Sequence, residues 1–156
     1  MDLRRDQLQR AAAVVHSLAS PREADGRLWL VFLGDRGVPY LVRRTADLLR
    51  DLDPLHLRDL AGTIAMVSDA LVAVAVYRAS GQARPVDRRL AAALAAAMGS
   101  GADRLLGVVV VGPGGHATSN ADVSPRARAD RGARASPSTR ASPGARDGPA
   151  VCFPLR

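Results

Sequence analysis

The 156-residue sequence has no lysine, a single glutamate and a single cysteine. All 22 basic residues are arginines, and Glu23 is the one glutamate among 15 acidic residues. This bias is typical of a GC-rich coding sequence, so the arginine content alone indicates no function. The lone Cys152 excludes an intramolecular disulfide and a zinc site built from several cysteines.

Long apolar runs are also missing. No run approaches the roughly 18 residues that a membrane-spanning helix needs, so no membrane span is expected. The first twenty residues have adjacent arginines and a short apolar stretch, as an export signal does. However, Asp2 and Asp6 flank the arginines, and His16 interrupts the apolar stretch. We therefore expect an amphipathic helix over residues 3–19 and a cytoplasmic location.

Positive charge is concentrated near the C-terminus. Residues 126–156 hold seven arginines and two aspartates, a net charge of +5, whereas residues 1–125 hold 15 arginines and 13 acids, a net charge of +2. From about residue 124 the sequence has no periodicity and almost no large apolar residues. This pattern predicts a single domain over residues 1–123 and a disordered tail over 124–156.

Apolar patterning in the first 123 residues predicts alternating helices and strands. Helices are expected over 3–19, from Asp53 to about 67, and over 85–98, and strands over 27–34, 39–44, 70–77 and 105–112. The last two strands are continuous apolar runs, which are typical of central strands covered on both faces. Two strand–helix–strand crossovers after a hairpin imply a mixed sheet flanked by helices. We expect an α/β, three-layer-like sandwich in the order α-β-β-α-β-α-β.

The three histidines give little support for a metal site. His16, His56 and His116 are too far apart in sequence to form a local ligand pair, so no metal or other cofactor is expected. His116 lies in "GPGGHATSN", which we expect to be a flexible loop after the last central strand. It is the best single candidate for a polar site, and a small hydrolase using His116 and Arg78 is one hypothesis. A solvated loop without function is the commoner case.

Other chemical motifs are missing as well. The glycines at 112–115 are not followed by a helix, whose N-terminus a phosphate-binding loop needs. "RASGQ", residues 78–82, lacks the G-x-S-x-G pattern of a nucleophile elbow. Neither phosphate binding by a glycine-rich loop nor serine nucleophile chemistry is therefore predicted.

The stretch "VYRASGQARPVDRRL", residues 76–90, leads from a central strand through Ser80-Gly81 into a helix that starts at Pro85. With the early hairpin and the helix order, it resembles the JAB/MPN domain of RadC-like proteins over roughly residues 3–120. Small actinobacterial proteins with this layout and no metal ligands are also similar. The resemblance implies a cytidine-deaminase-like sandwich. Active members of that family are zinc hydrolases with the motif His-x-His, seven residues, Ser, two residues, Asp.

When the motif is aligned on the Ser-Gly pair, its four ligand positions fall on Val76, Arg78, Val86 and Arg89. Valine and guanidinium side chains offer no lone pair to zinc. The resemblance therefore implies a pseudoenzyme: a RadC-like JAB domain without catalytic metal or enzymatic activity. We expect it to bind or scaffold an unknown protein partner.

Two further interpretations stay open. Arg78 and Arg89 are expected to meet near the start of the third helix, where they could bind an anion with His116 or pair with Asp87. Alternatively, the arginine-rich tail could bind nucleic acid weakly and without sequence specificity, through salt-sensitive phosphate contacts. The tail has no interleaved aromatic residues on which bases could stack, so sequence-specific binding is not expected.

Overall fold

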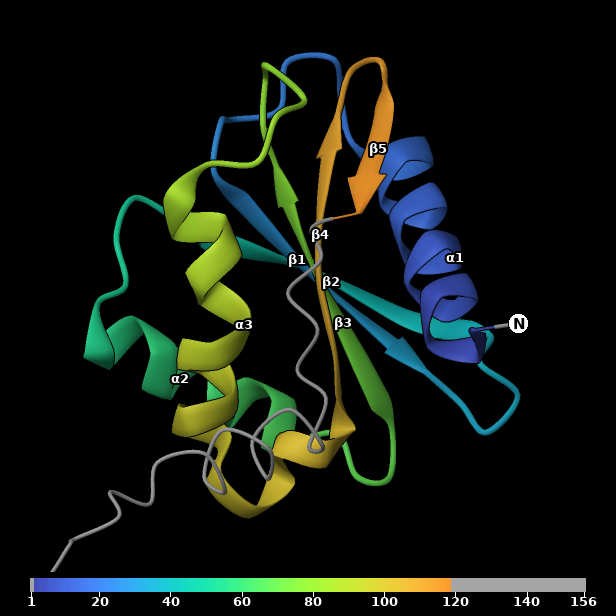
Figure 1. Cartoon of the computed structure of the whole chain (residues 1–156), viewed down its shortest axis with the longest axis vertical. Coiled ribbons are helices and arrows are strands. Elements are labelled where there is room, and N and C mark those ends of the chain that lie inside the picture. Colours follow the sequence, from blue (N-terminus) through green and yellow to red (C-terminus); the bar gives the residue numbers. More distant parts are fainter. Residues whose placement is uncertain (1, 119–156) are drawn as a thin grey trace, which may run out of the picture. The chain divides into compact units, whose positions relative to one another are not determined.

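A mixed β-sheet lies between helices on both of its faces in the computed structural model, which describes residues 2–118 (Figure 1). The elements in chain order are α1 (Leu3–Leu18), β1 (Arg27–Leu33), β2 (Pro39–Leu48), α2 (Pro54–Ala65), β3 (Leu71–Tyr77), α3 (Pro85–Met98), the 3₁₀ helix η1 (Gly99–Arg104), β4 (Leu105–Gly112) and β5 (Gly115–Thr118). The predicted α/β class and mixed sheet are confirmed. The elements η1 and β5 were not predicted.

The sheet has the strand order β2-β1-β3-β4-β5. β1 is antiparallel to both β2 and β3, whereas β3 and β4 are parallel and are connected through α3. Every residue of β4 is buried, as are all residues of β3 except Leu71. This burial explains why both strands appear in the sequence as uninterrupted apolar runs.

Alternate residues of the central strands build two separate apolar cores. Val72, Val74 and Val76 of β3 face the core that α2 and α3 cover, whereas Ala73 and Ala75 face the core beneath α1. The buried face of α1 also includes small residues, Ala11 and Ala12 among them. Small side chains on both sides let this single helix lie close to the sheet.

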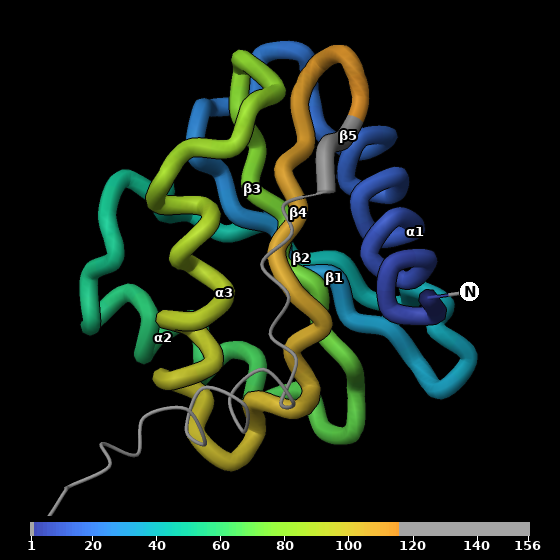
Figure 2. Tube along the Cα trace, in the orientation of Figure 1, coloured from blue at the N-terminus to red at the C-terminus, as the bar shows by residue number. Residues whose placement is uncertain are grey.

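Both ends of α1 are also tied to β4. Near its start, the Arg4 guanidinium donates to the carbonyl oxygens of Leu106 and Leu105, over 2.7 and 2.8 Å. Near its end, His16 Nδ1 lies 3.1 Å from the carbonyl oxygen of Gly112. Figure 2 shows the turn between β1 and β2 beside the start of α1. β4 thus holds α1 near both of its ends.

The helical spacing of apolar residues predicts a buried stripe on each of α2 and α3, and both predictions are correct in part. The predicted stripes are Leu57, Leu60, Ile64 and Val67 in α2 and Val86, Leu90, Ala93, Leu94 and Ala97 in α3. Leu57, Leu60 and Ile64 are buried in α2, but the helix ends at Ala65, so Val67 lies beyond it. In α3 the buried residues are Asp87, Leu90, Ala91, Leu94 and Ala95, whereas the predicted Ala97 is exposed. The alanine-rich sequence of α3 left the exact orientation of its buried face undetermined, because alanine is accommodated on either side.

β2 is longer than predicted. It runs to Leu48 rather than to residue 44, and its ladder with β1 is irregular because Arg27 pairs with Leu48 whereas Trp29 pairs with Arg44. At this bulge the Arg27 side chain donates hydrogen bonds to the carbonyl oxygens of Thr45 and Ala46. An exposed, bulged edge strand has no regular apolar alternation, so the sequence pattern did not indicate its full length.

The predicted flexible loop around His116 is wrong for residues 115–118. These residues form β5, which pairs antiparallel with β4 and places His116 opposite Val111. A two-residue turn, Pro113-Gly114, makes the connection possible. The predicted tail over 124–156 lies outside the described residues. Within residues 2–118, no helix is long and apolar enough to cross a membrane.

Candidate functional site: a buried arginine cluster at the start of α3

Arg78, the residue directly after β3, is only 1 % exposed and is the largest fully buried side chain among the described residues. Its guanidinium forms a bidentate pair with the carboxylate of Asp87 in the first turn of α3. The Nε–Oδ2 distance is 3.0 Å and the Nη2–Oδ1 distance is 2.6 Å. Asp87 is itself 0 % exposed. The loop between β3 and α3 therefore closes over a buried ion pair.

Two more charged residues extend this pair toward the surface. Arg78 Nη1 donates to Asp25 Oδ2 over 3.2 Å, and Asp25 Oδ2 also forms an ion pair with Arg84 Nη2 over 2.9 Å. The other Asp25 oxygen accepts from the backbone N–H of Ala79, over 2.9 Å. We call Asp25, Arg78, Arg84 and Asp87 the Arg78 cluster. The two positive and two negative charges of the cluster sum to zero.

The start of α3 helps to hold Asp87 in place. Asp87 Oδ2 accepts a hydrogen bond from the backbone N–H of Arg84, the N-cap residue, over 2.8 Å. A carboxylate in the first helical turn is also favoured by the helix dipole. Burial acts to lower the pKa of Arg78. The hydrogen bonds and charges of Asp87 and Asp25 outweigh burial, and the pKa of Arg78 is raised above its ordinary value.

Glycines let the backbone pack tightly around this cluster. A Cβ added to Gly112 would lie 2.6 Å from the Cα of Gly81 and 3.0 Å from the carbonyl oxygen of Arg78. A Cβ at Gly26 would lie 3.2 Å from Arg78 Nη1 and 2.8 Å from the Leu49 carbonyl oxygen. The guanidinium is thus enclosed by backbone as well as by its carboxylate partners.

The four positions aligned with the zinc motif lie in different environments. Val76 is buried in the core beneath α2 and α3, and Val86 packs against the same core. Arg78 is buried in its cluster, whereas Arg89 is exposed on α3. The predicted alternative, in which Arg78 and Arg89 pair with Asp87, is confirmed for Arg78 only, because within residues 2–118 Arg89 forms no ion pair with Asp87.

Anion binding by Arg78, Arg89 and His116 stays a prediction. The guanidinium of Arg78 already donates to two carboxylates, so an anion would have to compete with them. Within residues 2–118, Arg89 forms neither an ion pair nor a side-chain hydrogen bond with the Arg78 cluster. The His116 side chain lies outside the described part of the chain.

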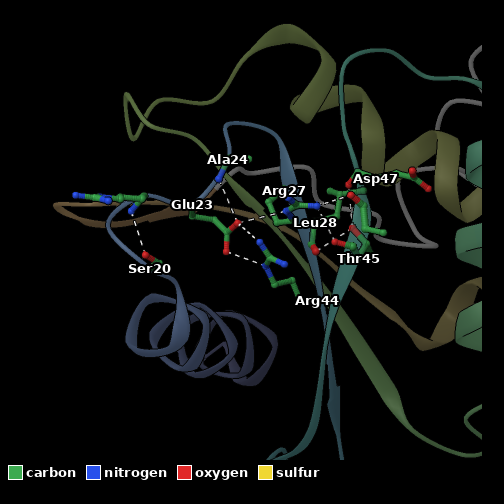
Figure 3. Close-up of polar contacts among 10 residues, drawn as sticks. Ser20, Glu23, Ala24, Arg27, Leu28, Arg44, Thr45 and Asp47 are labelled. Atoms are coloured by element: carbon green, nitrogen blue, oxygen red, sulfur yellow. Dashed lines mark hydrogen bonds and ion pairs between the residues drawn. The ribbon is translucent and has the colours of Figure 1, made fainter.

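A second ion cluster surrounds Glu23, whose side chain is buried (Figure 3). Its carboxylate accepts two hydrogen bonds from Arg44 of β2, 2.7 Å from Nη2 and 3.0 Å from Nε. Arg27 Nε of β1 also donates to it, over 3.3 Å. The Glu23 side chain is 3 % exposed. One feature of the sequence could have indicated this role for Glu23. It is the only glutamate in the chain, and every other acidic residue is the shorter aspartate.

Glu23 should make stability depend on pH. The hydrogen bond from Arg44 lowers the pKa of Glu23 below its ordinary value of 4.5; burial opposes this shift, and the Ala24 N–H and Arg27 support it. A carboxyl with a lowered folded-state pKa stabilises the fold above its unfolded-state pKa, and this contribution is lost as pH falls through the folded-state pKa. We therefore expect Glu23→Gln to reduce the free energy of unfolding by about 1–2 kcal/mol at pH 7.

The difference between Glu23→Gln and the unchanged protein should shrink as pH falls below 4.5, because protonated glutamic acid resembles the amide. Urea unfolding at pH 7, 5, 4 and 3 measures this difference. A difference that stays constant down to pH 3 would contradict the role assigned to the Glu23 carboxylate.

Two surface hollows lie away from the Arg78 cluster. One, of about 300 Å³, lies where α2 and α3 end and is lined by Ile64, Met98 and Arg104 among others. Another, of about 390 Å³, lies between the end of β2 and the start of α2 and includes Asp53 and His56. In the described part of the chain, no three His, Cys, Asp or Glu residues are grouped to hold a metal ion.

No protein-family model, curated protein or solved structure matches this chain. Its function therefore has to be inferred from the chemistry of its own residues.

Proposed function

We propose that the chain is a RadC-like JAB domain that has lost its metal site and acts by binding or scaffolding a protein partner. The observation that carries this proposal is the buried ion pair between Arg78 and Asp87. Arg78 stands where the aligned motif has its second histidine ligand. A side chain with a permanent positive charge therefore occupies a position that would face a metal cation in an active member.

The charges around Arg78 support this interpretation. Asp87 and Asp25 neutralise a guanidinium, as carboxylates near a metal site would neutralise a cation. Arginine remains charged at all relevant pH values and cannot offer a lone pair. Zinc at this position would have to displace the guanidinium and leave it buried without a partner.

The other aligned positions support the same proposal. Val76 and Val86 contribute to an apolar core and carry no donor atom. Helices on both faces of a mixed sheet also fit the sandwich that the resemblance implies. In this domain an internal ion pair occupies the position of the metal site. We therefore assign no reaction to the cluster and propose that the domain acts through contacts made by its surface.

Zinc binding tests the proposal. After incubation with zinc sulfate and desalting, the full chain should hold far less than one zinc per molecule by elemental analysis. The variant with Val76→His, Arg78→His, Val86→Ser and Arg89→Asp should gain close to one zinc, because it recreates the aligned ligand set. Circular dichroism checks that both proteins are folded.

The two measurements separate the parts of the proposal. Stoichiometric zinc in the unchanged chain would overturn the loss of the metal site. A folded four-residue variant that gains no zinc would instead count against the alignment with the JAB motif. Arg88→His, which adds a histidine on an exposed part of α3, controls for adventitious zinc binding.

A further inference from the structure

β2 is an open edge of the sheet. It is the first strand in the order β2-β1-β3-β4-β5, and no other strand among residues 2–118 pairs with its outer side. Ten residues long, it exceeds the typical strand of five or six residues. Six of the ten are exposed and none is fully buried. The backbone groups of an edge strand are a ready template for another strand.

Apolar side chains lie on both faces of this edge. Tyr40 is 58 % exposed and Leu41 is 42 % exposed, and Val38 just before the strand is 55 % exposed. Neighbouring residues of a strand point to opposite faces, so Tyr40 and Leu41 lie on different sides of the sheet. A strand added to this edge would cover apolar surface on both sides.

The charges along β2 are arranged symmetrically about Thr45. Arg43 lies two residues before it and Asp47 two residues after it, and both are exposed. Neither forms an ion pair within residues 2–118. If a second β2 pairs antiparallel about Thr45, Arg43 of each copy lies opposite Asp47 of the other. The edge is therefore complementary in charge to itself.

We propose that two copies of the chain associate through β2, antiparallel and centred on Thr45, to form one continuous sheet. The same register places Val42 opposite Leu48, so an apolar pair accompanies the ion pairs. A twofold axis generates each of these contacts twice. The proposal uses no residue of the Arg78 cluster and does not depend on the proposed function.

The bulge in β2 lies at the centre of this pairing, because residues 45–47 fall between the pairs Trp29–Arg44 and Arg27–Leu48. Bulges usually blunt sheet edges by twisting them away from partners. Here the Arg27 side chain bonds to the carbonyl oxygens of Thr45 and Ala46 from the inner side, and the Thr45 hydroxyl donates to the Leu28 carbonyl. These bonds connect Thr45 and Ala46 to β1 across the bulge.

Charge reversal tests the pairing. Sedimentation equilibrium of the full chain, over about 1–100 µM, should show a monomer–dimer equilibrium. Arg43→Asp and Asp47→Arg should each weaken the dimer by about 10- to 100-fold, because each replaces two attractive cross-strand pairs with two repulsive ones. The double variant Arg43→Asp/Asp47→Arg restores opposite charges and should dimerise like the unchanged chain.

Arg88→Asp is the matched control, since it makes the same charge change at an exposed position on α3 and should leave the dimer unchanged. A chain that is monomeric throughout the range would overturn the proposal. So would a dimer that tolerates both single reversals, or a double variant no better than either single one. These results are independent of zinc content, so failure here is distinct from failure of the proposed function.

Discussion

Asp87→Ala is expected to lower the free energy of unfolding by about 3–5 kcal/mol, because it leaves the Arg78 guanidinium buried without its main partner. Arg78 is only 1 % exposed, and Asp87 accepts two of its hydrogen bonds. The remaining partner, Asp25, accepts a hydrogen bond from only one nitrogen of Arg78. Urea unfolding followed by circular dichroism measures the loss.

Controls separate the ion pair from other effects of this substitution. Arg89→Ala removes an exposed arginine two positions away and should change stability by no more than about 0.5 kcal/mol. The double variant Arg78→Met/Asp87→Ala should be more stable than Asp87→Ala alone, since no unpaired charge stays buried. If Asp87→Ala lowers the free energy of unfolding no more than Arg89→Ala does, the Arg78–Asp87 pair is not buried as described.

Gly112→Ala is expected to lower the free energy of unfolding by about 3 kcal/mol, at the upper end of the usual range for overpacking. The new Cβ would lie 2.6 Å from the Cα of Gly81 and 3.0 Å from the Arg78 carbonyl oxygen. Both are backbone atoms, which cannot rotate away as a side chain does. Relief requires β4 to separate from the loop that carries Arg78.

Gly114→Ala is the matched control for this substitution. Gly114 lies two residues further on, in the turn to β5, and a Cβ there would meet nothing within 4 Å. The same chemical change should therefore have little effect on the urea midpoint. Equal losses in the two variants would show that the tight contact at Gly112 does not govern stability.

The sequence predicted the interior of this fold better than its edges. β3 and β4 are buried on both faces, so their apolar runs indicated their positions. β2 and β5 lie at the two edges of the sheet, where burial imposes a weaker pattern. The full length of β2 and the existence of β5 were missed for that reason.

The candidate site could be predicted only where its residues are close in sequence. Arg78 and Asp87 are nine residues apart across one strand–loop–helix connection, and their pairing was among the expected alternatives. Asp25 is 53 residues from Arg78 and joins it because β1 lies beside β3. Glu23 and Arg44 meet through the pairing of β1 with β2. Single-sequence patterns contain no information on such distant contacts.

The attachment of α1 to β4 has a consequence for synthesis of the chain on the ribosome. α1 is made before β4, and the carbonyl groups that hold its ends belong to Leu105, Leu106 and Gly112, about 100 residues later. At translation rates of about 5–20 residues per second, the helix spends roughly 5–20 s without the strand on which it docks. During that interval its apolar face is open to chaperones, and native docking is complete only when β4 has emerged.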